Sequence, residues 1–282
     1  MCENTHYERV FEGDALAKNY ALYRPGIPDR VTDTVLQLAD VKLKGSHPTL
    51  VVDVGCGSGQ FTRSLARHFD RVLGCDVSQA QIDEAKRQNQ QSHVDYCVSP
   101  AEALPVEDST VDVITASSAA HWFEYPTFFQ EVDRVLRPGG CVVVLATVRK
   151  TLHHQDAATE ERLFECKDKY MKALNEYRLI PRDTLVKFYE DLRFPSYEMK
   201  RDAIGEDLNF TASDYVNFMK TVSYSLKYRE KHPESKLFEE LKDSLHSILV
   251  SGEERSKDDS SPSFRLTWWY DVIIARKPET KS

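Results

Sequence analysis

Residues 49–61 read TLVVDVGCGSGQF, and this stretch decides the fold. Its apolar part, 49–56, predicts a buried strand, and a helical pattern starts after the glycines. The glycines alternate with other residues, so the backbone can turn tightly and a ligand can lie against it without meeting a Cβ atom. The start of the following helix offers free amide groups to an anionic group. The stretch therefore predicts a strand, a ligand-binding turn and a helix in succession.

Apolar runs and helical spacings alternate along the next part of the chain. Runs typical of buried strands occupy 71–77, 93–99, 111–118 and 141–148, and helical spacings occupy 30–40, 60–69, 79–90 and 127–140. Such alternation implies right-handed crossovers and a parallel sheet that is covered on both faces. Ligands of such sheets bind at the carboxyl ends of the strands. We therefore expect the loops after residues 54, 76, 99 and 117 to share one edge.

The pattern changes after residue 150. Helices are predicted at 156–178, 182–192, 212–228 and 234–250, strands at 196–204 and 263–277, and a mobile surface loop at 251–263. The two late strands would complete a seven-stranded α/β sheet, and the helices would form a lid. The expected divisions are N-terminal cap helices (1–48), a ligand-binding core (49–150), a helical lid with one core strand (151–262), and a last core strand with a tail (263–282).

The composition narrows the class of protein. Of 282 residues, 41% are hydrophobic, and the net charge of −8 argues against a general nucleic-acid-binding surface, which would be basic. No apolar run approaches the ~18 residues of a membrane span, and the first residues do not resemble a secretory signal. The six cysteines form no CxxC pair and suit reduced thiols in a core. We expect a cytoplasmic protein without a metal site.

Asp76 ends the second predicted strand, 17 residues beyond Gly59. A carboxylate at this place can accept hydrogen bonds from both hydroxyls of a nucleoside ribose, although an isolated aspartate could equally form a turn or cap a helix. A dinucleotide fingerprint would need glycine at position 60, where this chain carries Gln60. The glycine spacing therefore argues against an NAD-dependent dehydrogenase.

Taken together, these motifs resemble the class I S-adenosylmethionine-dependent methyltransferases of the methyltransferase type 11 superfamily. The similar stretches are VVDVGCGSGQF (51–61), GCDVS (74–78), the adenine-flanking SPAEALPVEDSTVDVI (99–114) and LRPGG (136–140). The resemblance implies a Rossmann-like sheet of five parallel strands with a C-terminal antiparallel pair and a helical lid insertion. It also implies S-adenosyl-L-methionine as the cofactor and S-adenosyl-L-homocysteine as the product.

A narrower resemblance, to the trans-aconitate methyltransferase-like group, extends outside this core. YALYRPGIP (20–28) is similar to a YxxxRPxYP segment of that group, and HWF (121–123), TVSY (221–224) and WWYDVIIARK (268–277) are also similar. Ile27 stands where the segment usually carries tyrosine. This likeness favours a carboxylic acid as the substrate.

The resemblance also implies roles for individual residues. Asp53 would sit beneath the glycine loop and interact with the ammonium group of the methionine part, directly or through water. Tyr20 and Arg24 would close over the cofactor, and Arg24 would pair with the methionine carboxylate or with an acidic substrate, unless it is a surface arginine before a proline turn. The expected cofactor-binding residues are Tyr20, Arg24, Asp53, Gly55, Gly57, Gly59, Asp76, Val77, Ala101, Glu102 and Ser117.

His121 is the candidate for acid–base work, because it follows the fourth predicted strand, where the methyl group should emerge. A histidine near its usual pKa could remove a proton from a hydroxyl, amine or thiol, whereas a carboxylate is already ionised at pH 7. The alternative role for His121 is packing. Trp122, Phe123, Tyr125 and Tyr224 would line the substrate pocket.

Three further signals favour structural roles. His153 and His154 are adjacent, would not face each other on a helix and indicate a solvated turn. The run WWY (268–270) indicates packing in a strand rather than a base-stacking platform. The charged run 156–178 indicates a solvated helix face with an apolar stripe that packs on the core. That stripe comprises Leu163, Cys166, Tyr170, Leu174 and Tyr177.

The sequence thus predicts a methyltransferase that acts on a small molecule, with a carboxylic acid as one candidate substrate. Two alternatives stay open. A tRNA-modifying methyltransferase is disfavoured by the acidic charge and by the lack of a basic cluster, and a non-catalytic protein of this fold would bind a partner instead. No long apolar heptad pattern is visible, so we expect a monomer or a weak dimer.

Overall fold

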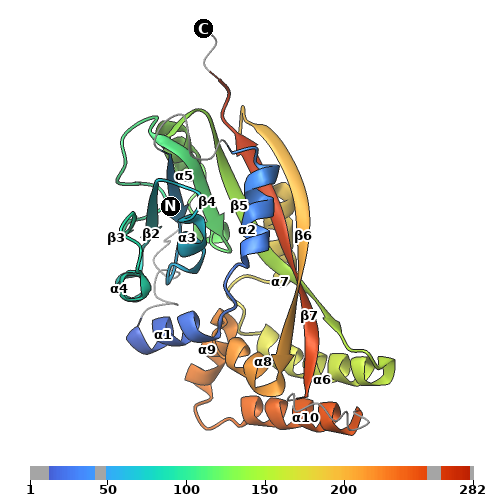
Figure 1. Cartoon of the computed structure of the whole chain (residues 1–282). Helices are drawn as coiled ribbons and strands as arrows, with labels where there is room; N and C mark the ends of the chain where they lie inside the picture. Colours follow the sequence, from blue (N-terminus) through green and yellow to red (C-terminus); the bar gives the residue numbers. More distant parts are fainter. Residues whose placement is uncertain (1–12, 42–48, 253–261, 280–282) are drawn as a thin grey trace.

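The computed structural model describes residues 13–41, 49–252 and 262–279. They form a seven-stranded sheet in the order β3-β2-β1-β4-β5-β7-β6 (Figure 1). The strands are β1 (Leu50–Val54), β2 (Arg71–Asp76), β3 (Val94–Val98), β4 (Val111–Ser117), β5 (Leu136–His153), β6 (Glu198–Thr211) and β7 (Ser263–Arg276). The helices are α1 (Asp14–Tyr23), α2 (Asp29–Leu38), α3 (Gln60–Leu65), α4 (Gln79–Gln88), the short 3-10 helix η1 (Ala120–Trp122), α5 (Thr127–Val135), α6 (Ala157–Asn175), α7 (Arg182–Asp191), α8 (Ala212–Met219), α9 (Ser223–Lys231) and α10 (Leu237–Gly252).

Strands β1 to β5 pair in parallel, and β7 lies antiparallel between β5 and β6. The predicted seven-stranded Rossmann-like sheet is therefore confirmed. The central strands β1, β4 and β5 are buried along most of their length. Strands that are covered on both faces need side chains that tolerate burial on either side, which explains why these segments read as nearly continuous apolar runs.

Two hydrophobic cores flank the sheet. On one face α2, α3 and α4 pack through side chains such as Val31, Phe61 and Ile82. On the other face α5 and α7 pack through side chains such as Phe128 and Tyr189. Because helices cover both faces, the carboxyl ends of the parallel strands remain as the edge where connecting loops meet and where a ligand can bind.

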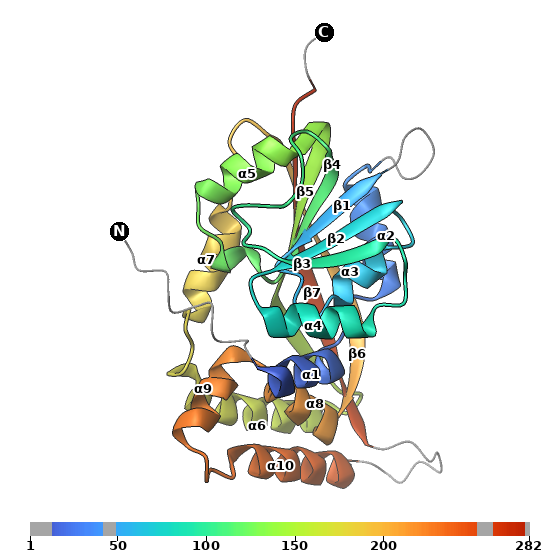
Figure 2. The ribbon, with the colours of Figure 1, turned by 90° about the vertical axis from the view of Figure 1, so that its left-hand side faces the viewer.

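Two of the last three strands, β5 and β6, are longer than the sequence predicts. β5 continues beyond the expected end at residue 148 to His153, and β6 continues beyond residue 204 to Thr211. Both extend because β7 pairs with them over its whole length, after a register shift in β5 between Ala146 and Arg149. The three strands thus form a ribbon that runs past the rest of the sheet toward α6, α8 and α10 (Figures 1 and 2).

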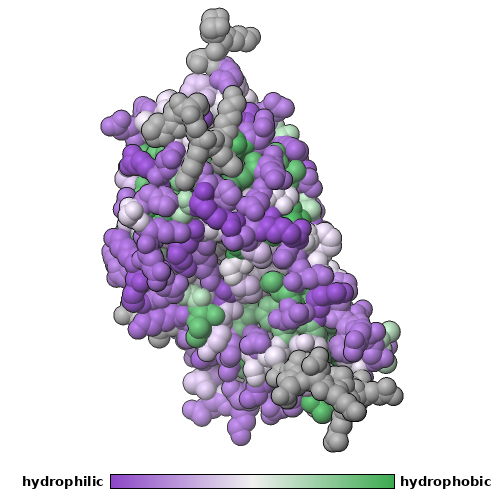
Figure 3. All heavy atoms as spheres, in the orientation of Figure 1, coloured by the Kyte–Doolittle hydropathy of each residue, from purple (hydrophilic) through white to green (hydrophobic). Residues whose placement is uncertain are grey.

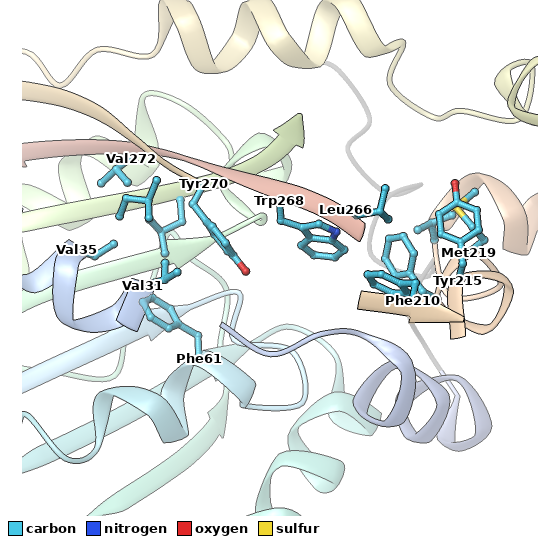
Figure 4. Packing of buried hydrophobic residues seen from close by; sticks show 14 of the residues in the cluster. Val31, Val35, Phe61, Phe210, Tyr215, Met219, Leu266, Trp268, Tyr270 and Val272 are labelled. Carbon is cyan, nitrogen blue, oxygen red and sulfur yellow. The ribbon is translucent and has the colours of Figure 1, made fainter. Parts of the chain in front are cut away.

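One apolar row follows β7 from the sheet into this ribbon (Figure 4). Val272 and Tyr270 lie near α2, and Trp268 continues the row toward Phe210 at the end of β6. Trp268 and Tyr270 are buried while Trp269 between them is not, because alternate residues of a strand face opposite sides. The prediction that these aromatic residues pack within a strand is confirmed.

The predicted helix 212–228 is two helices, α8 and α9. Thr211 caps α8 in a reciprocal arrangement with Asp214, and the chain becomes extended at Val222 before α9 begins. At the break, the hydroxyl of Thr221 donates to the carbonyl oxygen of Phe218 over 2.6 Å. A single long helix would have carried Thr221 in its interior, whereas the break leaves it free to meet other elements.

The apolar stripe of α6 packs on the core as predicted, because its buried residues belong to the same hydrophobic cluster as α2, α3 and α4, and its main neighbour there is α10. Leu163, Tyr170 and Leu174 are buried, and the Tyr170 hydroxyl lies 3.4 Å from the Ser244 hydroxyl of α10. The ribbon is the reason, because it places α6 and α10 side by side beyond the sheet (Figure 1).

The remaining structural predictions concern the surface. Most of the expected loop 251–263 falls outside the described residues. Within them, no helix has the length and apolar character of a membrane span, and no three His, Cys, Asp or Glu side chains group as metal ligands. His153 ends β5, and His154 accepts a hydrogen bond from the backbone amide of Asp156. The face in Figure 3 is largely hydrophilic, with scattered hydrophobic residues.

Candidate active site

A cavity of about 640 Å³ lies where the carboxyl ends of β1 to β4 meet. Each of these four strands contributes to the lining at its end or through the loop that follows it. The contributing residues include Gly55, Asp76, Ser99 and Ser117. The expectation that these loops share one edge is therefore confirmed. The opposite walls come from α1, η1, α6, α7, α8 and α9, which lie beyond this edge in Figure 2.

Asp76 organises the glycine turn from the neighbouring strand. One carboxylate oxygen, Oδ2, accepts a hydrogen bond of 2.8 Å from the backbone N–H of Gly57, and Oδ1 accepts one of 2.9 Å from the N–H of Ser78. Burial raises the pKa of Asp76, and the two backbone hydrogen bonds oppose that rise. The carboxylate is thus fixed on the cavity wall, where it can accept further hydrogen bonds from a ligand.

Gly57 faces the cavity in the left-handed backbone region, at φ +54°. A Cβ atom built there would project between Gln81 Oε1 and the ring of Tyr20, into the space that a ligand could use. Gln81 Oε1 is buried and, among the described residues, has no hydrogen-bond partner. A buried acceptor beside a glycine turn fits a polar ligand. Gln81 belongs to no sequence motif and was not among the predicted residues.

Asp53 is not among the residues that line the cavity. It is buried beneath the turn, and its two carboxylate oxygens accept hydrogen bonds of 2.7 Å from the hydroxyls of Thr62 and Thr115. Burial raises the pKa of Asp53 to about 6, against the effect of those two hydrogen bonds. Its visible role is to tie β1 to α3 and β4.

Gly59 is also absent from the cavity wall. It begins α3 with φ +75°, and a Cβ atom at this position would overlap the ring of Tyr96. The glycine is therefore required by the backbone conformation and by close packing against β3, not by a ligand.

Helix α1, near the N-terminus of the chain, forms one wall of the cavity. Tyr20 lies in this helix and Arg24 directly follows it. The guanidinium of Arg24 stacks 4.7 Å from the centre of the Tyr20 ring and donates from Nε to the hydroxyl of Thr221 over 3.0 Å. Gln60 holds this end of α1, because its Nε2 donates to the carbonyl oxygens of Arg24 and Ala21 over 2.9 and 3.2 Å. Gln60 thus links the glycine turn to the cover.

Most of the other predicted site residues line the cavity, and Tyr125 does not. The cavity lining includes Val77, Ala101, Glu102, Ser117, His121, Trp122, Phe123 and Tyr224. Glu102 also accepts a hydrogen bond of 2.7 Å from the backbone N–H of Glu124. Tyr125 is not part of the wall, because its ring packs into the second core against Phe128 and Phe129.

His121 pairs with a residue that the sequence did not indicate. Its Nδ1 lies 2.6 Å from the hydroxyl of Tyr189 on α7. Burial lowers the pKa of His121 to about 4, so the imidazole is neutral at pH 7. Burial also raises the pKa of Tyr189, which keeps the phenol protonated. A protonated phenol can donate to Nδ1 or accept from it, so the imidazole proton lies on Nε2 when the phenol is the donor.

Five cationic side chains also line the cavity, and the sequence motifs indicated only Arg24 among them. They are Arg24, Lys150, Lys167, Arg178 and Arg182. Lys150 lies on the extended part of β5, where its ammonium group is 4.4 Å from the centre of the Trp268 ring. The charged run 156–178 is thus not wholly a solvated face, because one side of α6 with Lys167 lines the cavity. These cations are far apart in the sequence and form no linear motif.

The sheet order, the glycine turn and the acid that ends β2 together define a class I methyltransferase. The family model described as a methyltransferase domain matches residues 52–144. A methyltransferase-family protein of Dictyostelium discoideum is 30% identical over 206 residues, which cover 72% of this chain and 73% of that protein. The chain therefore belongs to the class I S-adenosylmethionine-dependent methyltransferases.

Further relatives extend this finding. Malonyl-[acyl-carrier protein] O-methyltransferase of Hahella chejuensis is 32% identical over 147 residues, which cover 51% of each protein. The structure of a type II methyltransferase-family protein from Anaeromyxobacter dehalogenans matches the fold with a TM-score of 0.71 at 23% identity, over 91% of this chain and all of that one. A phosphoethanolamine N-methyltransferase of Haemonchus contortus, solved with S-adenosyl-L-methionine, matches with a TM-score of 0.50 at 17% identity, over 95% of this chain and 58% of that one.

Proposed function

We propose that this chain transfers a methyl group from S-adenosylmethionine to a small organic acid. One observation carries the proposal: a single cavity joins the turn held by Asp76 to a wall that carries cations and aromatic rings. Methyl transfer depends on alignment of the two reactants and on exclusion of water. A shared cavity under the cover of α1 suits both needs.

The cofactor end fits S-adenosylmethionine by the chemistry of its residues. Asp76 would accept hydrogen bonds from the ribose hydroxyls, Gly57 would leave room for the methionine part, and Gln81 Oε1 would accept from its ammonium group. Val77 and Ala101 would flank the adenine. When bound, S-adenosylmethionine supplies an electrophilic methyl group on a sulfonium centre.

His121 suits the orientation of an acceptor better than the removal of a proton. Its pKa of about 4 makes it a weak base. In the tautomer whose Nδ1 accepts from the Tyr189 hydroxyl, Nε2 is a hydrogen-bond donor. A donor can hold an oxygen of a carboxylate, and that substrate needs no base because it is ionised at neutral pH. The Hahella relative, named for O-methylation of a malonyl group, supports an acid as acceptor.

Calorimetric titration with S-adenosylhomocysteine tests the cofactor end. Wild type should bind, and Asp76→Ala should weaken binding by about tenfold or more, because hydrogen bonds to a charged group contribute about 1.5–3 kcal/mol. Asp95→Ala is the matched control, since Asp95 is exposed on the neighbouring β3. Equal binding by Asp76→Ala and wild type would overturn the assignment.

Transfer of labelled methyl groups tests the acceptor class. Purified protein with labelled S-adenosylmethionine should modify a fraction of small organic acids, and the product should be cleaved by alkali as an ester is. Labelling of tRNA instead would favour the tRNA-modifying alternative. Cofactor binding without labelling of any metabolite fraction or RNA would favour a non-catalytic binding protein.

A further inference from the structure

Five cationic side chains gather on the part of the cavity wall that β5, α6 and the start of α7 build together with the end of α1. They come from five places in the sequence. Lys150 belongs to β5, Lys167 to α6, Arg182 to α7, Arg178 to the link between those helices, and Arg24 to the end of α1. In a chain with a net charge of −8, such a gathering needs an explanation.

Aromatic contacts show that these cations are close to one another. The ammonium group of Lys150 and the guanidinium of Arg24 lie 5.9 and 5.4 Å from the centre of the same ring, that of Phe218. The guanidinium of Arg178 lies 4.1 Å from the centre of the Tyr224 ring. Burial and the charges of four other cations together lower the pKa of Lys150 to about 7; those cations are Arg24, Arg178, Arg182 and Lys167.

The cations lack protein counter-ions. In the described part of the chain none of the five forms an ion pair, and Asp168, which also lines the cavity, pairs instead with Lys172 over 2.8 Å. Their recorded hydrogen bonds go to neutral groups, such as Thr221 for Arg24, the carbonyl oxygen of Thr147 for Lys150 and Asn175 for Arg178. Like charges that share a partly buried site repel each other unless an anion joins them.

We propose that these five side chains form an anion subsite, which holds a group of the substrate that carries two or more negative charges and is separate from the atom that receives the methyl group. The inference rests on the proposed function and extends it from one acidic group to at least two. Four cations remain even when Lys150 is neutral, so a single carboxylate would leave most of the charge unbalanced.

The chemistry of the subsite limits the ligand. Guanidinium groups donate paired hydrogen bonds to planar or tetrahedral oxyanions, and a lysine adds a point charge. Phe218 and Tyr224 beside them offer apolar surface to a short carbon skeleton. Two sources fit this description, a phosphate monoester and a di- or tricarboxylate, and both present a multiply charged oxyanion.

Anion binding by the full-length protein tests the subsite directly. Calorimetric titrations at constant ionic strength would compare sulfate, a dianion, with propionate, a monoanion. Each titration would be run with and without S-adenosylhomocysteine. We expect sulfate to bind at least about tenfold more tightly than propionate, because charge-assisted hydrogen bonds to several cations add up. Titrations with glycerol 3-phosphate and with citrate then distinguish a phosphate monoester from a tricarboxylate. The compound that binds more tightly identifies the anionic group that the subsite prefers.

A matched pair of variants on one helix provides the control. Lys167→Gln removes a cavity cation, whereas Lys169→Gln removes an exposed lysine of α6 and changes the net charge equally. Lys167→Gln should weaken sulfate binding about three- to tenfold, and Lys169→Gln should leave it unchanged. Sulfate binding no tighter than that of propionate, or equal effects of the two variants, would overturn the subsite. Failure to bind S-adenosylhomocysteine would count against the proposed function alone.

Discussion

The Nδ1 atom of His121 lies 2.6 Å from the hydroxyl oxygen of Tyr189, across 68 residues of sequence. This bond joins the segment after β4 to α7, so the helix that covers one face of the sheet also fixes the orientation of a side chain in the cavity. When the tyrosine donates to Nδ1, the imidazole carries its proton on Nε2 and donates toward a ligand.

Tyr189→Phe should lower kcat by roughly tenfold with little change in KM, because the tautomer and position of His121 are no longer held. His121→Gln should retain more activity than His121→Ala, since glutamine keeps a donor. The kcat of wild type should be flat between pH 6 and pH 8, where a histidine with a pKa of about 4 stays neutral. A kcat that rises through pH 6.5 would instead identify His121 as a base.

Asp53 provides a test of a structural role. Asp53→Ala should destabilise the fold by about 2–3 kcal/mol, because the hydroxyls of Thr62 and Thr115 lose a buried acceptor. Asp53→Asn should retain most of the stability and should bind S-adenosylhomocysteine as wild type does. Loss of cofactor affinity in Asp53→Asn without loss of stability would restore the predicted contact with the ligand.

The stability of the Asp53→Asn variant should also depend less on pH. The folded-state pKa of Asp53 is raised to about 6 from 3.8, so the folded state holds this proton more tightly than the unfolded state does. The contribution of Asp53 to stability is therefore present below pH 4 and is lost as the pH rises through 6. Urea unfolding of wild type and Asp53→Asn at pH 5 and pH 7 measures the difference.

Gln60→Ala should loosen the cover of the cavity. The substitution removes both hydrogen bonds from α3 to the end of α1, while the side chain makes no core contact that the fold requires. We expect S-adenosylhomocysteine to bind about three- to tenfold more weakly, with a small change in thermal stability. Gln90→Ala, at an exposed glutamine, should leave affinity unchanged. Equal affinities in the two variants would show that α1 is held without Gln60.

Sulfate affinity should fall as the pH rises. The pKa of Lys150 in the free cavity is about 7, and a bound anion favours the protonated amine, so binding is strongest below pH 7 and weakens above it. Between pH 6 and pH 8 the affinity should drop by about tenfold. The other charged or titratable groups that face Lys150 are Arg24, Lys167, Arg178, Arg182, Asp168, Tyr215 and Tyr224. Lys150→Met should abolish the pH dependence, and its persistence would assign the effect to another group.

The cofactor half of the cavity could be predicted from the sequence, because its residues lie in short motifs at the carboxyl ends of consecutive strands. Gly57 and Asp76 belong to such motifs, and the sheet brings them together by pairing β1 with β2. Asp53 belongs to the same motif but points into the core. Spacing along a strand shows where a residue lies, and only the packed structure shows which side its carboxylate faces.

The cationic half could not be predicted in this way. Lys150 lies in a part of β5 that exists because β7 pairs with it, and the sequence ends that strand at residue 148. Lys167 belongs to a helix with charges on several faces, whose position depends on α10. Tyr189 and His121 meet only because α7 packs on the same face of the sheet as α5. Each contact depends on long-range packing that no local pattern contains.

The register shift in β5 has a mechanical consequence. Thr147 and Val148 lie within the shift and line the cavity, between residues that pair with the sheet and Lys150 on the ribbon. A bulge bends a strand and re-aims its side chains. The angle at this joint therefore sets how far the anion subsite stands from the glycine turn. Small changes at Thr147 or Val148 could retune the length of acceptor that the enzyme takes while the cofactor end stays as it is.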